Sequence, residues 1–172
     1  MSYGLDLIRL PSGGDRDQAY RQYREEQSRA GTSVLDDEDP GPLDPSKEDR
    51  KQRLASALIA RDPDLKKFER NYAKIAAGRS ISEAEARRII RNIELNDHRN
   101  HIQIDLRDDE GSIGFSPEGR GDACARSVRI LWDCLRVLES EGGYSAWDPQ
   151  INRLLNLDSD YDTLVKNICA AG

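Results

Sequence analysis

A group of four carboxylates lies where two short runs of alternating apolar residues meet. It consists of Asp105, Asp108, Asp109 and Glu110. Paired carboxylates can act in general acid–base catalysis, but no neighbouring residue predicts the dry pocket that would shift their pKa values. Tight turns favour Asp on backbone grounds alone, so a solvated hairpin tip is one interpretation. The other, which we carry forward, is that these acids bind a partner.

A second acidic run lies in a segment rich in proline and glycine. Residues 30–45 contain Asp36, Asp37, Glu38 and Asp39, and this composition predicts an acidic loop or linker. Acidic runs in such loops are usually only solvated. The functional alternative is an acidic finger that enters a basic cleft, so these four residues are our second candidate partner-binding set.

Two sets of possible metal ligands fail on their spacing. His98 and His101 lie in a turn rich in Asn and Asp, and no third ligand stands at a spacing typical of zinc. The run Asp158–Asp162 begins like a calcium loop, but Thr163 replaces the glycine and Cys169 the bidentate glutamate that such a loop needs. We expect no metal and no cofactor.

The cysteines and glycines also match no reactive motif. Cys124, Cys134 and Cys169 have no zinc, redox or disulfide spacing, and we expect them to be small buried core residues. Residues 111–121 are rich in glycine but follow neither the P-loop nor the dinucleotide pattern. No nucleophile motif is present, so we expect no catalytic residue.

The charges are distributed unevenly along the chain. Residues 1–45 carry 5 basic and 10 acidic side chains, residues 46–92 carry 13 and 7, and residues 93–172 carry 8 and 15. The basic middle can be neutralised internally by its acidic flanks, or the acidic C-terminal half can attract a basic protein. The net charge of −6 disfavours direct binding of nucleic acid.

The sequence contains no segment that we expect to contact a membrane. No apolar run approaches the ~20 residues that cross a bilayer. The first residues lack the basic and apolar regions of a secretion signal. We therefore expect a cytoplasmic protein.

Periodicity and capping residues predict the elements that position these groups. We expect strands over 3–10, from Ile93, over 102–107 and 113–115, and extended segments over 144–147 and 151–157. A slip in the alternation at Ile8 suggests a bulge in the first strand. We expect helices over 15–29, from Ser46, from Pro63 to Gly78, from Ser82, over 122–141 and from Ser159.

This order of elements predicts an α+β fold. We expect an antiparallel sheet of about four to six strands with helices packed on one face. The length of 172 residues suits a single domain, 1–172, in which 30–45 is the acidic loop or linker.

Three segments resemble a group of small uncharacterised bacterial proteins. They are Met1–Leu5, Ile93–Asn96 with Ile102–Ile104, and Glu141–Tyr144 with Trp147–Gln150. Some proteins of this type resemble immunity proteins of polymorphic or interbacterial toxin systems. The resemblance covers mainly residues 1–10 and 60–172, implies a partner-binding role and implies no catalytic residue.

The leading hypothesis from the sequence is a non-enzymatic binding protein. An immunity protein that occludes a toxin with a basic surface needs charge and shape complementarity and no reactive group. One alternative is a small enzyme or ligand-binding domain with a pocket between helices and sheet, where His98 and His101 would titrate near neutral pH. Another is an adaptor subunit whose basic middle helices contact an acidic partner.

Overall fold

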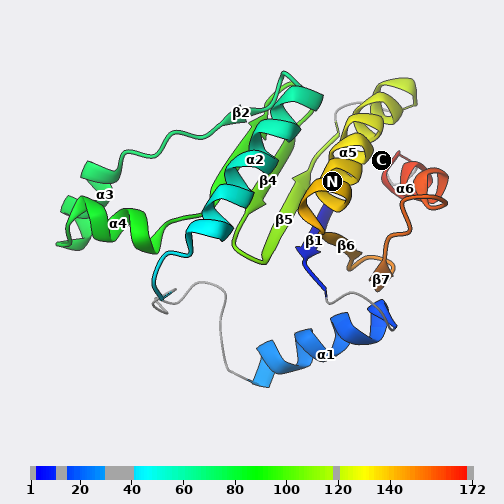
Figure 1. Ribbon diagram of the computed structural model, residues 1–172. Helices are drawn as coiled ribbons and strands as arrows, with labels where there is room; N and C mark the ends of the chain where they lie inside the picture. Colours follow the sequence, from blue (N-terminus) through cyan, green and yellow to red (C-terminus); the bar gives the residue numbers. More distant parts are fainter. Residues whose placement is uncertain (1–2, 11–14, 30–40, 118–120, 170–172) are drawn as a thin grey trace.

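The computed structural model describes residues 3–10, 15–29, 41–117 and 121–169 (Figure 1). In these ranges the chain has the predicted α+β fold, with helices packed against an antiparallel sheet. The strands are β1 (Tyr3–Ile8), β2 (Lys66–Lys67), β3 (Ile93–Asp97), β4 (Ile102–Leu106), β5 (Glu110–Phe115), β6 (Ser145–Asp148) and β7 (Arg153–Leu154). The helices are α1 (Arg16–Arg29), α2 (Pro45–Arg61), α3 (Tyr72–Arg79), α4 (Glu83–Ile89), α5 (Asp122–Gly142) and α6 (Tyr161–Cys169).

Within the described ranges the sheet has seven strands in the order β2-β3-β4-β5-β1-β6-β7. Every pair of neighbours is antiparallel. The count exceeds the expected four to six because β2, an edge strand of only two residues, lies where a helix was expected, while β7 lies in the extended segment expected over 151–157. Such short segments give almost no periodic signal in a sequence.

One face of the sheet forms the main hydrophobic core. The register aligns Leu5, Ile113, Ile104 and Leu95 across β1, β5, β4 and β3, and all four side chains are buried. The apolar sides of α2 and α5 pack on this face, and α6 lies against α5 (Figure 1). Because side chains alternate along a strand, the next residue of each strand lies on the opposite face, which these helices leave uncovered.

The slip at Ile8 is not a bulge. The pairing of β1 with β5 is continuous from Tyr3 to Ile8, so Ile8 lies on the face opposite the main core. There it forms a separate small cluster with Tyr20 of α1 and Trp147 of β6, whose rings stack at 4.0 Å. Ile8, the second of two consecutive apolar residues, therefore lies where α1 covers one end of the opposite sheet face.

Capping residues fix most helix ends where the sequence predicts them. The Ser82 hydroxyl accepts a hydrogen bond from the Glu85 backbone N–H at the start of α4. Gly143, with φ +67°, ends α5 in a left-handed conformation that glycine adopts without strain. The start of α2 is capped by Asp44 and not by Ser46, since the Asp44 carboxylate accepts from the Ser46 N–H.

The helix expected from Pro63 to Gly78 is wrong in its first half. Asp62 instead ends α2, and its carboxylate accepts the Asp64 backbone N–H in a tight turn. The turn buries Leu65 in the main core and lets β2 pair with the free edge of β3. Phe68 then lies 52% exposed, so the apolar spacing that predicted one helical face comes from residues with separate surroundings.

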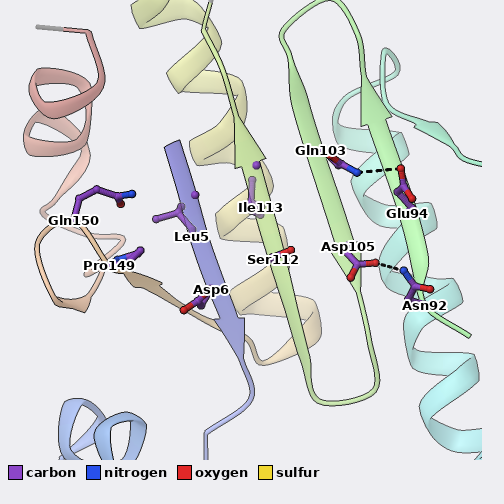
Figure 2. Close-up of a pocket in the computed structure, with 12 residues that line it drawn as sticks. Leu5, Asp6, Asn92, Glu94, Gln103, Asp105, Ser112, Ile113, Pro149 and Gln150 are labelled. Carbon is purple, nitrogen blue, oxygen red and sulfur yellow. Dashed lines mark hydrogen bonds between the residues drawn. The ribbon is translucent and has the colours of Figure 1, made fainter. Parts of the chain in front are cut away.

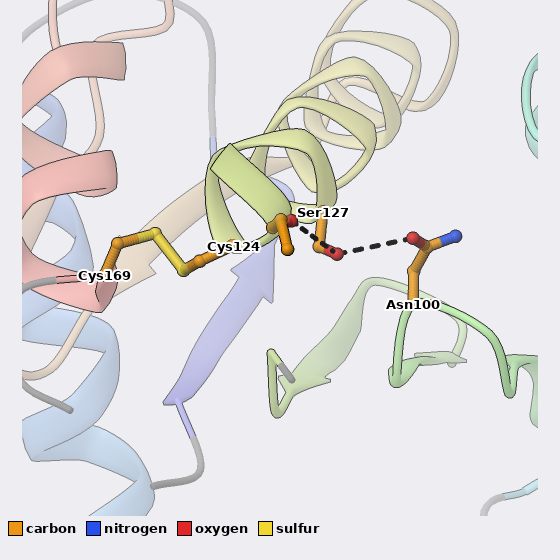
Figure 3. Close-up of a disulfide and its surroundings, with 5 residues drawn as sticks. Asn100, Cys124, Ser127 and Cys169 are labelled. Carbon is orange, nitrogen blue, oxygen red and sulfur yellow. Dashed lines mark hydrogen bonds between the residues drawn. A yellow bond between two sulfur atoms is a disulfide. The ribbon is translucent and has the colours of Figure 1, made fainter. Parts of the chain in front are cut away.

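Two of the three cysteines form a disulfide, although their spacing predicted none, and Cys124 is also buried in the main core as expected. Cys124 at the start of α5 is bonded to Cys169 at the end of α6, with a Cα–Cα distance of 5.8 Å (Figure 3). Only Cys134 is free in the described chain, and it is buried as expected. The sequence separation of 45 residues gave no signal, because the pairing depends on how α6 returns to α5.

We predict that reduction of this disulfide destabilises the fold without changing its secondary structure. In the chain-entropy model, opening a loop of this length costs about 4 kcal/mol. Urea unfolding of wild type and of the double variant Cys124→Ser/Cys169→Ser, each with and without dithiothreitol, measures the loss. Dithiothreitol should lower the urea midpoint of wild type and leave that of the double variant unchanged. Equal midpoints for the two proteins without dithiothreitol would contradict the prediction.

Candidate functional site

The two acids at the tip of the predicted hairpin are held by cations of α2. The Lys51 side chain is 0% exposed, and its ammonium lies 2.8 Å from the Asp108 carboxylate and 2.6 Å from Glu48. The same ammonium donates to the Arg91 carbonyl. Arg91 pairs with the other oxygen of Asp108 at 2.8 Å. Asp108 is thus a partner of two internal cations.

Asp109 is enclosed in the same way. Arg9, Lys47 and Arg50 contact its carboxylate at 3.1, 2.5 and 3.0 Å. Partial burial raises the pKa of Asp109, but the hydrogen bonds and charges of Lys47, Arg9 and Arg50 outweigh it and hold the pKa below its ordinary value. The hairpin tip is therefore a place where the basic middle of the chain is neutralised by its acidic half.

The other predicted acids have different surroundings. Asp105 lies one strand residue before the tip, on the uncovered face of the sheet, and Glu110 is exposed at the start of β5. Asp36, Asp37, Glu38 and Asp39 lie outside the described residues. The structure thus separates the four hairpin acids into a pair that contacts several cations, Asp108 and Asp109, and two others. Asp105 is 16% exposed and pairs with Arg107 alone among the described cations, and Glu110 is exposed.

A hollow lies on the uncovered face of the sheet. The register places Glu94, Asp105, Ser112 and Asp6 in one row across β3, β4, β5 and β1. The adjoining row contains Gln103, Gly114 and Gly4. Together with Asn92 and the Pro149–Gln150 turn, these residues line a hollow of about 520 Å³ (Figure 2). We call it the open-face hollow.

The lining of the open-face hollow is acidic. Three of its residues are carboxylates, Asp6, Glu94 and Asp105, and none of the described residues that line it is a cation. Arg70 reaches Glu94 at 3.3 Å and Arg107 reaches Asp105 at 3.0 Å, both from outside the lining. Two of the three carboxylates are thus paired with arginines at the margin, while the described lining itself contributes only negative charge.

Hydrogen bonds orient these carboxylates. The Tyr20 hydroxyl of α1 donates to Asp6 at 2.8 Å, and burial together with this bond raises the pKa of Tyr20, so the hydroxyl stays protonated. The Gln103 amide donates to Glu94 at 3.0 Å, and the Asn92 amide donates to Asp105 (Figure 2). The acids are thus held in place before any ligand arrives.

Buried polar contacts also position the far wall of the hollow. The Asp148 side chain is fully buried at the end of β6, where it accepts hydrogen bonds from the Tyr3 hydroxyl and the Gln150 backbone N–H. Burial and the adjacent Asp148 carboxylate raise the pKa of Tyr3, which keeps it a donor. These bonds fix the Pro149–Gln150 turn beside β1.

Sequence reasoning identified only Asp105 of the three acids in the hollow. Asp6 and Glu94 are single acids in separate strands, and nothing in the linear sequence places them beside each other. The resemblance to small bacterial proteins did include Glu94 and several neighbours of Asp6 and Asp105. The segments that carry the resemblance contain Gly4, Glu94, Gln103 and Gln150, and all four residues meet at this hollow.

The groups considered for metal binding or catalysis do not come together. His98 and His101 are exposed in the turn between β3 and β4, and neither lines the open-face hollow. Among the described residues, no group of three or more His, Cys, Asp or Glu side chains is arranged to hold a metal ion. Asp160, the centre of the calcium-like run, instead accepts hydrogen bonds from both terminal nitrogens of Arg153.

A further carboxyl, Asp62, is buried away from the hollow. One of its oxygens has no hydrogen-bond partner in the described structure. Burial raises the pKa of Asp62 above its ordinary value, and the charges of Asp97 and Asp64 add to this, while the bond from the Asp64 N–H opposes it. This site is a cost to the fold at neutral pH and offers no opening to a ligand.

A scan of protein-family models and searches of curated proteins and of solved structures found no match to this chain.

We predict that Lys51→Met destabilises the protein by about 3–5 kcal/mol, because it removes the fully buried cation that contacts both Asp108 and Glu48 and leaves Asp108 with Arg91 alone among the described cations. The exposed pair Arg99–Asp64 provides the matched control, and Arg99→Met should cost less than about 1 kcal/mol. Urea unfolding of both variants makes the comparison. Similar losses for the two would mean that the buried ion pair does not hold the hairpin.

We predict that Asp62→Asn stabilises the protein at neutral pH. A folded-state pKa above the unfolded value favours folding at low pH, and this contribution is lost as the pH rises through the folded pKa. The variant should therefore have the higher Tm at about pH 7, and the difference should shrink as the pH falls, because the raised pKa lets the wild-type carboxyl take up a proton at a higher pH in the folded state than in the unfolded state. A difference in Tm that does not depend on pH would contradict the assignment.

Proposed function

We propose that this protein is a non-enzymatic binding module, an immunity protein that binds and inhibits a cognate bacterial toxin through a basic surface of that toxin. The observation that carries the proposal is the open-face hollow, where three ordered carboxylates lie on an uncovered sheet face and none of the lining residues that the structure describes is a cation. Such a field attracts a positively charged partner and raises its association rate.

The arrangement of the remaining charges supports this choice of surface. Most of the cations of α2 that could weaken the field are engaged with Asp108 and Asp109 at the hairpin tip. Of the acids predicted from the sequence, Asp105 lies in the hollow. Glu110 lines a smaller hollow of about 150 Å³ that shares Asp6 and Ser112 with it. The partner-binding surface that we propose thus keeps Asp105 and Glu110 and adds Asp6 and Glu94.

The disulfide bears on where the partner is met. None of the described helices has both the length and the apolar composition to span a bilayer. Disulfides are rare in cytosolic proteins and persist in oxidising compartments. The Cys124–Cys169 bond therefore weighs against the cytoplasmic location expected from the sequence, and we propose that the complex forms in an oxidising compartment.

The proposal predicts that this chain protects cells from a toxin encoded beside it. Expression of the neighbouring reading frame alone should arrest growth, and co-expression of this chain in the same compartment should restore it. The triple variant Asp6→Asn/Glu94→Gln/Asp105→Asn should lose protection and, with purified proteins at low salt, should associate about tenfold or more slowly.

The matched control removes three exposed acids elsewhere, Glu139→Gln/Glu141→Gln/Asp158→Asn. It has the same net charge as the triple variant, and it should protect as well as wild type. Equal loss in both variants would show that only net charge matters. Full protection by the open-face variant would refute the proposed surface.

A further inference from the structure

Two glycines form the floor of the open-face hollow. Gly4 of β1 and Gly114 of β5 are paired across the two central strands, and Gly114 is also paired with Gln103 of β4. Their lack of side chains leaves the sheet face bare over β1 and β5 beside the carboxylate row.

The fold does not require glycine at either position. Neither residue has a positive φ. A Cβ atom added to Gly4 would come no closer than 3.9 Å to another atom, and one added to Gly114 no closer than 4.0 Å. Gly111 in the same strand is different, because a Cβ there would lie 2.4 Å from the Asp105 carbonyl oxygen.

Glycine also weakens a strand. It gains nothing from cross-strand packing and loses more backbone entropy on folding than other residues. A glycine in a central strand that is not needed for a turn, a bulge or a close internal contact often marks a place where a ligand or another backbone approaches. The paired glycines at the centre of an uncovered face fit that case.

We propose that the open-face hollow receives an extended arginine- or lysine-bearing segment of the protein partner, whose backbone lies on the floor of Gly4 and Gly114 while its cationic side chains meet Asp6, Glu94 and Asp105. This inference rests on the proposed function for the identity of the partner. It adds the part of the partner that is recognised and the contact that requires bare backbone.

Charge decides between this occupant and others. A nucleic acid would bring phosphates against three carboxylates. A second copy of this chain, docked face to face about a two-fold axis, would place the same carboxylates opposite one another. A basic peptide segment satisfies the carboxylates and needs no deep pocket, which agrees with a hollow that lies on a sheet surface.

The test uses a short peptide of alternating arginine and alanine and an otherwise identical glutamate peptide. At low salt, the arginine peptide should shift the amide NMR signals of Gly4 and Gly114 in the full-length protein, and the glutamate peptide should not. Gly114→Val should weaken binding at least about tenfold while its Tm stays equal or rises by about 2–4 °C. Gly78→Ala, in α3 with open space around it, is the matched control and should bind as wild type does.

The inference is overturned if the arginine peptide leaves both glycine signals unchanged, or if it binds Gly114→Val as tightly as wild type. If Gly114→Val does not fold, Gly114→Ala and Gly4→Ala take its place, and unchanged affinity in both has the same meaning. Growth protection separates this inference from the proposed function. If the glycine variants still protect growth, the inference alone is refuted. If the wild-type protein binds the arginine peptide but does not protect growth, the proposed function alone is refuted.

Discussion

The ion pair between Lys51 and Asp108 is the contact on which the arrangement of the molecule depends. Lys51 is the only lysine in the described chain with no exposed surface, and a buried ammonium is tolerated only when it is paired and hydrogen-bonded. Its partners come from α2, the hairpin tip and the segment before β3. The pair therefore ties α2 to the hairpin tip and to the segment before β3, on the face where the apolar side of α2 packs against the sheet.

The same contact sorts the charges of the protein. A chain with a basic middle and acidic flanks can either neutralise itself or expose both signs. Here the cations nearest the sheet are satisfied at the hairpin tip by Asp108 and Asp109. The acids on the other face, Asp6, Glu94 and Asp105, are held by neutral donors and by two arginines at the margin. The internal neutralisation is thus seen at the hairpin tip, and attraction of a basic partner by the other face is our proposal.

The fold could be predicted wherever the signal is local. Alternation of apolar residues predicted β3, β4 and β5, and the capping residues Ser82 and Gly143 predicted helix ends. Prediction failed where the position of a residue depends on contact with a segment that is distant in the sequence. Leu65 is drawn into the core by a turn, Ile8 meets a helix on the other face, and Cys124 pairs with Cys169 across 45 residues. The candidate site could not be predicted for the same reason. Asp6 and Glu94 come into one row with Asp105 only through the strand register.

We propose that a basic partner binds the uncovered sheet face and not the hairpin tip. Carbodiimide cross-linking of the purified complex, read by mass spectrometry, tests it most directly, because the reagent joins carboxylates to lysine amines that are in contact. We expect cross-links from Asp6, Glu94 or Asp105 to lysines of the partner. Cross-links that come from Asp108 or Asp109, with none from the open-face hollow, would contradict it.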